Sequence, residues 1–310
     1  MRKILPIMLI AALLMGCSAS ESCAQQTVFC MDTVMDIQIW GQDRQQAMDA
    51  VVAMLQSLED TWSATDENSL LCLLNRGEGM PDEEQQAFLD KALALQERTA
   101  GAFDPKLGSI IALWGFYEDA YRVPAVQEIT EAKTSPKWDL GALVKGYAGF
   151  RATQILARYN VDRAILNLGG NIQTYGEKEN GTPWNIGVQD PEGGTALGTL
   201  SISGTMAVVT SGDYQRYFEL EGVRYHHILD PETGIPADSG LSSVTVICAD
   251  GAVADALSTA LFVMGLEEAV ALWQQSDDFE AVFLLKDGTI YATEGTALSG
   301  CEYEVIRREN

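Results

Sequence analysis

Histidine is nearly absent from this 310-residue chain. Its only two histidines, His226 and His227, are neighbours, so any chemistry that depends on an imidazole must use this one stretch. Imidazole is the side chain that most readily takes up or releases a proton near neutral pH. Residues 224–229 have the composition of a strand, and Asp-Pro-Glu-Thr-Gly at 230–234 indicates a tight turn after it. A histidine placed there either packs the strand and its loop or faces a cleft, and this segment alone leaves both interpretations open.

Positive charge is also scarce. The chain has 20 lysines and arginines against 44 aspartates and glutamates, a formal net charge of −24. Such a protein has no electrostatic attraction for nucleic acid or for an anionic lipid surface, so we expect no nucleic-acid partner. A phosphorylated ligand would need cations brought to its site locally, and a divalent metal ion is the obvious source.

Several familiar signatures are missing. The chain has no Rossmann or Walker glycine motif, no internal repeat, and no CxxC or Cys/His spacing that would indicate a zinc site. Five cysteines follow Cys17, an odd number, and we interpret them as mostly buried thiols with one disulfide allowed.

The first 16 residues have the pattern of an export signal. Arg2 and Lys3 precede an apolar run, residues 4–15, that is too short to remain as a membrane-spanning helix. The run ends in Leu-Met-Gly-Cys17, which resembles a bacterial lipoprotein processing box. We therefore expect a signal peptide over 1–16, a lipidated Cys17 and a polar tether over 17–27. The mature protein, with a net charge of −26 once Arg2 and Lys3 are lost, would be lipid-anchored to the bacterial cell membrane on its extracytoplasmic face.

Helical patterns dominate the first half of the chain, and strand patterns dominate the second. A strand is expected at 33–40, and helices are expected at 45–61, 69–74, 82–99 and 146–159. Short strands are then expected at 164–168, 171–175, 184–188, 199–202, 208–210, 217–220, 224–229 and 243–248, followed by helix at 253–264 and 267–275 and a hairpin over 280–292. This distribution predicts an α+β fold for one domain, residues 28–310, made of two intimate subdomains: a helix-bearing half and an antiparallel strand-rich half.

Three segments combine glycine with acidic or polar residues in a way that packing alone does not require. Residues 101–105, Gly-Ala-Phe-Asp-Pro, predict a tight turn that presents an aromatic ring and a carboxylate. Residues 139–147 open a helix, where backbone N–H groups and Lys145 are placed to meet a phosphate. Residues 167–171, Asn-Leu-Gly-Gly-Asn, form a glycine turn flanked by two amides.

A fourth segment carries two oxygen side chains on a predicted helix. Asp255 and Thr259 are four residues apart and hence on one face, and their oxygens suit a hard cation such as Mg²⁺. Structural alternatives exist for each segment. Asp255 also favours a helix N-terminus, Thr259 can bond to its own helix, a Gly-Gly pair is often a bend, and Lys145 can be a solvated charge.

Taken together, these motifs resemble the ApbE family of FAD:protein FMN transferases over about residues 29–293. They fall in the family's order: residues 29–33, 62–63 with 68–69 and 74–75, 101–105, 139–142 with 145–147, 167–171, 211–214, 227–231 with 233–234, and 254–259. Two positions depart from the family pattern. Asp32 stands where glycine is common, and Thr65 stands where an aromatic residue often flanks the flavin.

The resemblance implies a T-fold-like architecture with FAD in the cleft between the two halves. It implies that the flavin and adenine regions are lined by Met31, Ala102, Phe103 and Asp104. It also implies that the nucleotide is contacted by Asp139, Lys145 and Ile228.

The same resemblance implies a metal site and a catalytic residue. Mg²⁺ would be held by the backbone carbonyl of Ala142 together with Asp255 and Thr259. His227 would be the base that accepts the proton of the attacking hydroxyl, His226 would be structural, and Asp230 would orient the turn.

The implied reaction is Mg²⁺-dependent transfer of FMN from FAD to a threonine or serine hydroxyl of an acceptor flavoprotein. It forms a phosphoester bond and releases AMP. Two alternatives stay open at this point. One is hydrolysis of FAD to FMN and AMP, and the other is an extracytoplasmic lipoprotein that binds FAD without reacting.

Overall fold

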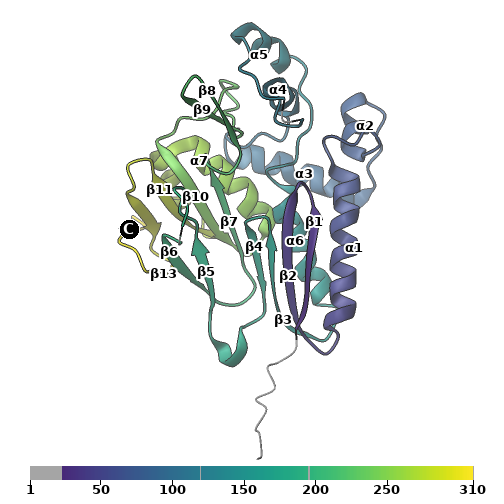
Figure 1. The fold of residues 1–310 in the computed structure, drawn as a ribbon, viewed down its shortest axis with the longest axis vertical. Coiled ribbons are helices and arrows are strands. Elements are labelled where there is room, and N and C mark those ends of the chain that lie inside the picture. The colour runs from purple at the N-terminus through teal and green to yellow at the C-terminus, as the bar shows by residue number, and fades with distance from the viewer. Residues whose placement is uncertain (1–22, 119, 195, 310) are drawn as a thin grey trace, which may run out of the picture.

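A nine-stranded sheet runs through the computed structural model, which describes residues 23–118, 120–194 and 196–309 (Figure 1). The strand order is β1-β2-β3-β4-β7-β10-β11-β12-β14, and only the β12–β14 pair is parallel. The strands are β1 (Ala24–Cys30), β2 (Thr33–Gly41), β3 (Val161–Leu168), β4 (Asn171–Tyr175), β7 (Ala207–Gly212), β10 (Leu241–Cys248), β11 (Phe279–Leu285), β12 (Ile290–Thr293) and β14 (Glu304–Ile306). The helical and strand-rich halves of the sequence therefore share one sheet.

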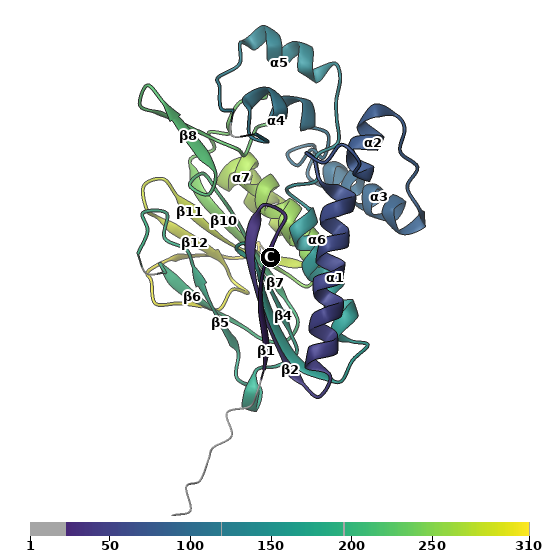
Figure 2. The same ribbon diagram turned by 45° about the vertical axis from the view of Figure 1, so that its right-hand side comes forward.

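Long helices lie against one face of this sheet, and a small second sheet covers part of the other face (Figures 1 and 2). The helices are α1 (Arg44–Trp62), α2 (Leu70–Arg76), α3 (Glu83–Arg98), α4 (Gly108–Trp114), α5 (Val126–Lys133), α6 (Val144–Leu156) and α7 (Gly251–Gln274), with a 3-10 turn, η1 (Glu179–Gly181). The small sheet has the order β13 (Leu298–Ser299), β6 (Gly198–Ile202), β5 (Trp184–Val188), and a separate hairpin consists of β8 (Tyr217–Leu220) and β9 (Val223–His226).

Strand alternation accounts for the two-sided core. On β2, Met35, Ile37 and Ile39 are fully buried in the core that includes α1 and α6, because every second side chain of a strand points to the same face. The opposite face of the main sheet packs against β5 and β6 through a second core that includes Trp184 and Ile186. The α+β class predicted from the sequence is confirmed.

The predicted helix starts at Ser69 and Asp82 are confirmed by their hydrogen bonds. Ser69 accepts the N–H of Cys72 at 3.0 Å, and Asp82 forms a reciprocal capping box with Gln85, with both distances 2.8 Å. Capping residues of this kind satisfy backbone donors that have no partner within the helix, so they fix where the helix begins.

Three sequence expectations need correction. The polar tether expected over 17–27 is wrong for residues 24–27, which belong to β1; this is an edge strand that pairs with β2 along its whole length, so it needs little apolar character. Residues 17–22 of that tether, Cys17 among them, and the signal peptide lie outside the described residues. The strand expected over 224–229 ends at His226, and the short helices α4 and α5 were not predicted.

Helix α7 is the apolar centre of the second half of the fold. By length and composition it could cross a membrane, yet Leu257, Leu261 and Phe262 are fully buried in the core that α7 shares with β7 and β10. Asp250 caps its start and accepts the N–H groups of Ala252 and Val253. These features are those of a core helix in a globular domain.

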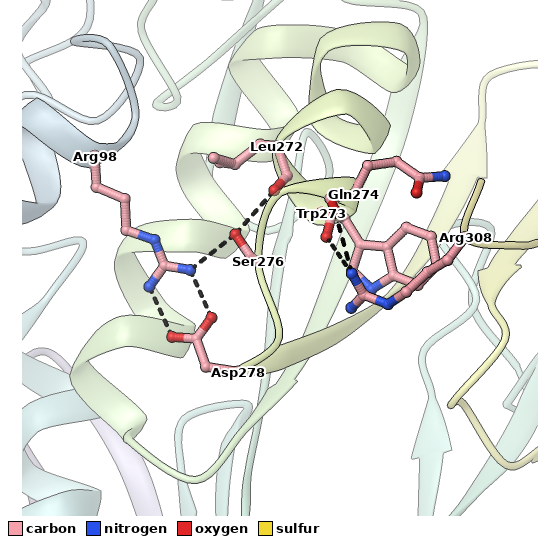
Figure 3. A network of polar contacts seen from close by, with 7 residues as sticks. All are labelled: Arg98, Leu272, Trp273, Gln274, Ser276, Asp278 and Arg308. Carbon is pink, nitrogen blue, oxygen red and sulfur yellow. Dashed lines mark hydrogen bonds and ion pairs between the residues drawn. The ribbon is translucent and has the colours of Figure 1, made fainter. Parts of the chain in front are cut away.

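The far end of α7 is tied to two other parts of the chain (Figure 3). Arg98, at the end of α3, donates two hydrogen bonds to the carboxylate of Asp278, at 2.8 and 2.6 Å, and a third to Ser276 at 3.2 Å. Arg308 donates to the carbonyl oxygens of Trp273 and Gln274, the last residues of the helix, at 3.0 and 3.4 Å. Arg308 thus satisfies free carbonyl groups at the C-terminus of α7, and Arg98 ties the segment that follows the helix to α3.

Helices α6 and α7 touch where they cross, at Gly146. A Cβ atom at this position would lie 2.0 Å from the carbonyl oxygen of Gly251 and 2.6 Å from Cβ of Asp255. The backbone N–H of Gly146 uses this closeness to donate to Oδ2 of Asp255 at 2.8 Å. Only glycine allows this approach.

We therefore expect Gly146→Ala to lower the free energy of unfolding by at least about 1–3 kcal/mol, the usual effect of forcing an extra methyl group into a packed core. Denaturation in urea, followed by circular dichroism, measures this change. Gly149→Ala on the same helix is the matched control, because its Cβ would meet only the side chain of Gln173, at 3.1 Å or more, and the loss should be smaller. Equal stability of Gly146→Ala and wild type would contradict this account of the crossing.

Candidate active site

A cavity of about 730 Å³ opens where the helices meet one end of the main sheet. Its walls include the β1–β2 and β3–β4 turns, the end of β7, the segment before α6, and one face of α7. All eleven residues predicted to bind FAD, hold metal or act in catalysis line it: Met31, Ala102, Phe103, Asp104, Asp139, Ala142, Lys145, His227, Ile228, Asp255 and Thr259. The structure thus brings the predicted set together, and the role of each residue stays a prediction.

Carboxylates outnumber cations in this cavity. Its lining includes five carboxylates, Asp32, Glu59, Asp104, Asp139 and Asp255, against the two cations Lys145 and Arg216. A pyrophosphate bound here would meet net negative charge unless a further cation came with it. The cavity therefore has the electrostatic character of a site that takes an anionic ligand together with a metal ion.

Asp139 is held in place from both sides of its carboxylate. The hydroxyl of Tyr117 donates to Oδ2 at 2.6 Å, and the N–H of Gly141 donates to Oδ1 at 3.0 Å. Burial, with the carboxylate of Asp139 nearby, raises the pKa of Tyr117 well above its ordinary value, so the phenol keeps the proton that it donates. The N–H of Asp139 donates to the carbonyl of Pro105 at 2.8 Å, which joins two of the sequence motifs.

The predicted turn at 101–105 is present, but its carboxylate and its aromatic ring have different roles. Asp104 faces the cavity, and its Oδ1 accepts hydrogen bonds from the side chain of Gln96 at 2.8 Å and the N–H of Lys106 at 2.9 Å. Phe103 contributes to the cavity wall but is only 2 % exposed, because its ring packs into the main core. The aromatic ring of this motif is thus mainly a packing element.

The β1–β2 turn has an unusual backbone. Met31 and Asp32 have φ angles of 51° and 60°, in the left-handed region that favours glycine. Glycine adopts this conformation without strain, whereas Asp32 adopts it at an energetic cost. The N–H of Met31 donates to Oε1 of Glu59 on α1 at 3.0 Å, which anchors the turn at the cavity wall.

Asp255 and Thr259 both line the cavity and carry side-chain oxygen atoms that a metal ion could use. Asp255 is 4 % exposed, and its Oδ2 accepts the N–H of Gly146, which leaves Oδ1 without a donor among the described residues. Thr259 Oγ1 lies 3.2 Å from the hydroxyl of Ser211 on β7. Because the N–H of Gly146 goes to Asp255, the carbonyl of Ala142 is left without a donor in the described structure.

This donor set consists of oxygen atoms only. One carboxylate, one hydroxyl and one carbonyl suit Mg²⁺, which prefers oxygen ligands and keeps several waters. The described residues contain no group of three or more histidine, cysteine, aspartate or glutamate side chains placed to hold a metal ion. The arrangement therefore fits a magnesium ion shared with a phosphate ligand, and it does not fit a zinc site built by the protein alone.

Asn171 presents an unused donor to the same cavity. Its side chain is 95 % buried, since the residue is 5 % exposed, and no acceptor for Nδ2 lies among the described residues. The other amide of this turn, Asn167, accepts the N–H of Gly170 at 2.8 Å and so stabilises the turn itself. A buried donor without a partner is costly, so Asn171 is well suited to a ligand oxygen.

His227 faces the cavity with a defined tautomer. Its Nδ1 lies 3.0 Å from the carbonyl oxygen of Arg216, which also accepts the backbone N–H of His227 at 3.0 Å. A carbonyl can only accept, so Nδ1 carries the proton in the neutral ring and Nε2 keeps its lone pair. Burial lowers the pKa of His227 to about 4, so at neutral pH the ring is an uncharged base.

His226 points the other way. It is 6 % exposed, its Nε2 lies 3.0 Å from the carbonyl of Ala237, and its ring meets the edge of Phe262 on α7. Adjacent residues at the end of a strand face opposite sides, which separates the two histidines into one core residue and one cavity residue.

Three of the polar side chains that line the cavity and were not predicted are Glu59, Tyr117 and Arg216. Glu59 lies in the last turn of α1, Tyr117 in a segment without a motif, and Arg216 just after the Ser-Gly-Asp-Tyr motif. Each reaches the site through the fold, so no local spacing indicated Glu59 or Tyr117. The motif at 211–214 was a signal for Arg216.

A buried neutral imidazole and several oxygen donors on one cavity of about 730 Å³ are features of an enzyme site. The chain belongs to the ApbE family, whose family model matches residues 31–283.

Curated relatives and solved structures agree with this assignment. The chain is 34% identical over 288 residues to the FAD:protein FMN transferase of Treponema pallidum, covering 80% of each protein. It is 37% identical to that of Klebsiella pneumoniae over 212 residues, 61% of this chain and 65% of that protein.

Among solved structures, the ApbE protein of Thermotoga maritima superposes with a TM-score of 0.83 at 35% identity, covering 88% of this chain and 98% of that one. The flavin transferase ApbE of Vibrio cholerae has a TM-score of 0.78 at 25% identity, covering 88% and 97%.

We expect burial to lower the pKa of both imidazoles below the ordinary histidine value of 6.5, that of His227 to about 4. Between pH 6.5 and pH 4 His227 is protonated in the unfolded chain but neutral in the folded protein. Protonation of the unfolded chain therefore lowers the free energy of unfolding as the pH falls from 6.5 toward 4, and this loss is absent above pH 6.5. NMR titration of ring-labelled histidine measures both sites, with His226→Gln for assignment. A midpoint of 6.5 for His227 would contradict the buried, neutral ring.

Proposed function

We propose that this protein transfers FMN from FAD to a threonine or serine hydroxyl of another protein and releases AMP. The observation that carries this proposal is the placement of a neutral His227 on the same cavity as the oxygen atoms of Asp255 and Thr259. Family membership and the names of the relatives, FAD:protein FMN transferase, support the choice of substrate.

FAD fits the cavity in size and chemistry. About 730 Å³ lies within the range of small-molecule sites, about 300–1,000 Å³. By family resemblance the flavin and adenine regions meet Met31 and residues 102–104, and the nucleotide meets Asp139, Lys145 and Ile228. The free amide donor of Asn171 is available for an oxygen atom of the same ligand.

Mg²⁺ fits the donors of Ala142, Asp255 and Thr259. When bound there, the ion would neutralise charge on the phosphate oxygens while FMN is transferred from AMP to the acceptor hydroxyl. The positive charge of the ion is needed because the cavity has more carboxylates than cations.

The residues of the chain account for the remaining requirements of the reaction. Nε2 of His227 takes the proton from the acceptor hydroxyl, whose oxygen forms a bond to the phosphorus of the FMN half. The bond from that phosphorus to the bridging oxygen breaks, and AMP leaves with this oxygen. Lys145 and Asn171 are placed in the same lining to stabilise phosphate oxygens.

We expect His227→Ala to reduce FMN transfer about 10²–10⁴-fold, the usual contribution of a general base. Asp255→Asn should reduce it about 100-fold and raise the Mg²⁺ concentration needed for half-maximal rate. The assay uses FAD, Mg²⁺ and membranes from a strain that lacks the protein, and it measures flavin fluorescence that survives denaturing electrophoresis.

Asp250→Asn is the matched control for these variants. It removes a carboxylate from the same helix, but it lies outside the cavity lining, and asparagine caps a helix as well as aspartate does. Wild-type labelling by His227→Ala would rule out its role as the base. Release of AMP without any labelled protein would favour FAD hydrolysis instead, and stable FAD binding without turnover would favour a binding protein.

We also propose that the protein is exported and held on the extracytoplasmic face of the bacterial cell membrane by a lipid on Cys17. This proposal depends on the sequence of residues 1–17, which lie outside the described structure. A polar link to residue 23 would let the domain reach acceptor proteins at the membrane surface.

Cys17→Ser should move the protein from the membrane fraction to the soluble fraction and abolish incorporation of radiolabelled fatty acid, because only the thiol can be lipidated. Cys23→Ser is the control, since it changes a nearby thiol without touching the processing box. Membrane retention of Cys17→Ser would overturn the proposed anchor.

A further inference from the structure

The β8–β9 hairpin stands apart from both larger sheets and leads directly to His227 (Figure 1). Its base is closed by the two hydrogen bonds that His227 makes with the carbonyl of Arg216, the residue before β8. The same two residues line the cavity. The hairpin is therefore continuous with the candidate active site.

The two faces of this hairpin differ in character. Residues that pair across an antiparallel ladder share a face, so Tyr217 and His226 lie on one face with Glu219 and Arg224. Arg224 on this face lies 3.8 Å from Glu219 and 4.2 Å from the ring centre of Tyr217. Its polar groups thus have partners within the hairpin.

The opposite face is apolar along its whole length. It consists of the pair Phe218–Tyr225 and, nearer the tip, the pair Leu220–Val223. Phe218 stacks on Tyr225 and on Tyr121, with ring centres 5.2 and 5.1 Å apart. Phe116 continues this cluster to the cavity, 6.0 Å from Phe218 and 6.4 Å from His227.

This apolar face is covered at the base of the hairpin and exposed at its tip. At the base, Trp114 packs against Tyr225 and Tyr121 stacks on Phe218. At the tip, Leu220 is 48 % exposed and Val223 is 52 % exposed. The turn between them, Glu221-Gly222, has φ angles of 53° and 80°, typical of a tight two-residue hairpin turn that holds the pair in place. About half of each side chain of this pair is therefore left open to a partner.

We propose that Leu220 and Val223 dock the acceptor protein, through apolar side chains that lie beside the threonine or serine that receives FMN. This inference rests on the proposed function. A hydroxyl carried by a protein must reach Nε2 of His227, so the segment around it has to pass over the base of the hairpin. FAD enters the cavity and needs no surface outside it, whereas a second substrate of protein size does.

The charges nearby narrow the chemistry of the docking segment. Glu219 and Arg224 flank the apolar pair and offset each other, which leaves Glu221 at the tip as the uncompensated charge of a strongly acidic chain. An acidic segment would be repelled, so the fitting partner has apolar residues and no excess of carboxylates next to its target hydroxyl.

The test uses the purified mature chain with the substitutions Leu220→Asp and Val223→Asp together. Val305→Asp is the matched control, because Val305 is 44 % exposed on β14, at the opposite edge of the sheet from β1 and outside the cavity lining. Acceptor is supplied as membranes from a strain lacking the protein, with FAD and Mg²⁺. The rate of protein-bound flavin fluorescence is measured, and FAD affinity is measured separately from the change in flavin fluorescence on binding.

The double variant should label protein at least about tenfold more slowly than wild type, as expected when central apolar contacts of an interface are lost. Its FAD affinity should stay within about twofold of wild type, and Val305→Asp should match wild type in both assays. A photoreactive phenylalanine analogue placed at position 220 should form a crosslinked product whose partner carries FMN on threonine or serine.

Four outcomes would overturn the inference. Unchanged labelling by the double variant would show that the pair is not used, and a parallel loss of FAD affinity would show that it acts through the cavity. Crosslinking only to a second copy of this chain, or binding of unlipidated wild type to lipid vesicles through this pair, would assign the surface to another occupant. Failure of wild type itself to label any protein would instead refute the proposed function.

Discussion

Where α6 crosses α7, the N–H of Gly146 donates to Asp255 at 2.8 Å and no side chain separates the helices. This contact sets three features of the cavity at once. It orients the carboxylate of Asp255, and it leaves the carbonyl of Ala142 without the hydrogen bond that the N–H of Gly146 would otherwise donate. It also brings the start of α6 beside the face of α7 that carries Thr259. The ends of α7 are fixed by Asp250 at its start and by Arg308 at its last turn, so the crossing cannot shift independently of the fold. A site of this kind depends on the rigidity of its supporting helices.

An acidic lining around an anionic substrate looks unfavourable at first. Most of these carboxylates, however, are already engaged. Asp139 accepts two hydrogen bonds, Asp104 accepts two, and Glu59 accepts the N–H of Met31. Asp255 is the carboxylate that offers an oxygen atom, Oδ1, in the same lining as Thr259 and Ala142. Much of the negative charge thus takes part in the hydrogen bonds that hold the cavity walls, and Asp255 is where we expect a divalent cation to compensate a pyrophosphate.

The sequence predicted which residues gather at one cavity better than it predicted every element around that cavity. Residues such as Asp255 and Thr259, or Gly101 to Pro105, are close in the chain, so local spacing and turn chemistry were enough to single them out. Glu59 and Tyr117 reach the cavity only because α1 and the segment after α4 are packed over it, a tertiary effect that no local pattern encodes. β1 was missed for a related reason. Its alternation is weak, and its stability comes from pairing with β2 at the edge of the sheet.

The histidine pair shows how local and tertiary information combine. The sequence alone left packing and proton transfer open for both rings. The end of β9 resolves the question, because one ring turns into the α7 core and the other toward the cavity. The carbonyl of Arg216 then fixes the tautomer of His227 by accepting from Nδ1, and burial keeps the ring neutral at physiological pH. The hairpin that supplies this carbonyl also carries the exposed Leu220–Val223 pair. One small element therefore orients the proposed base at one end and presents an apolar pair at the other, so the proposed docking surface and the proposed base belong to the same hairpin.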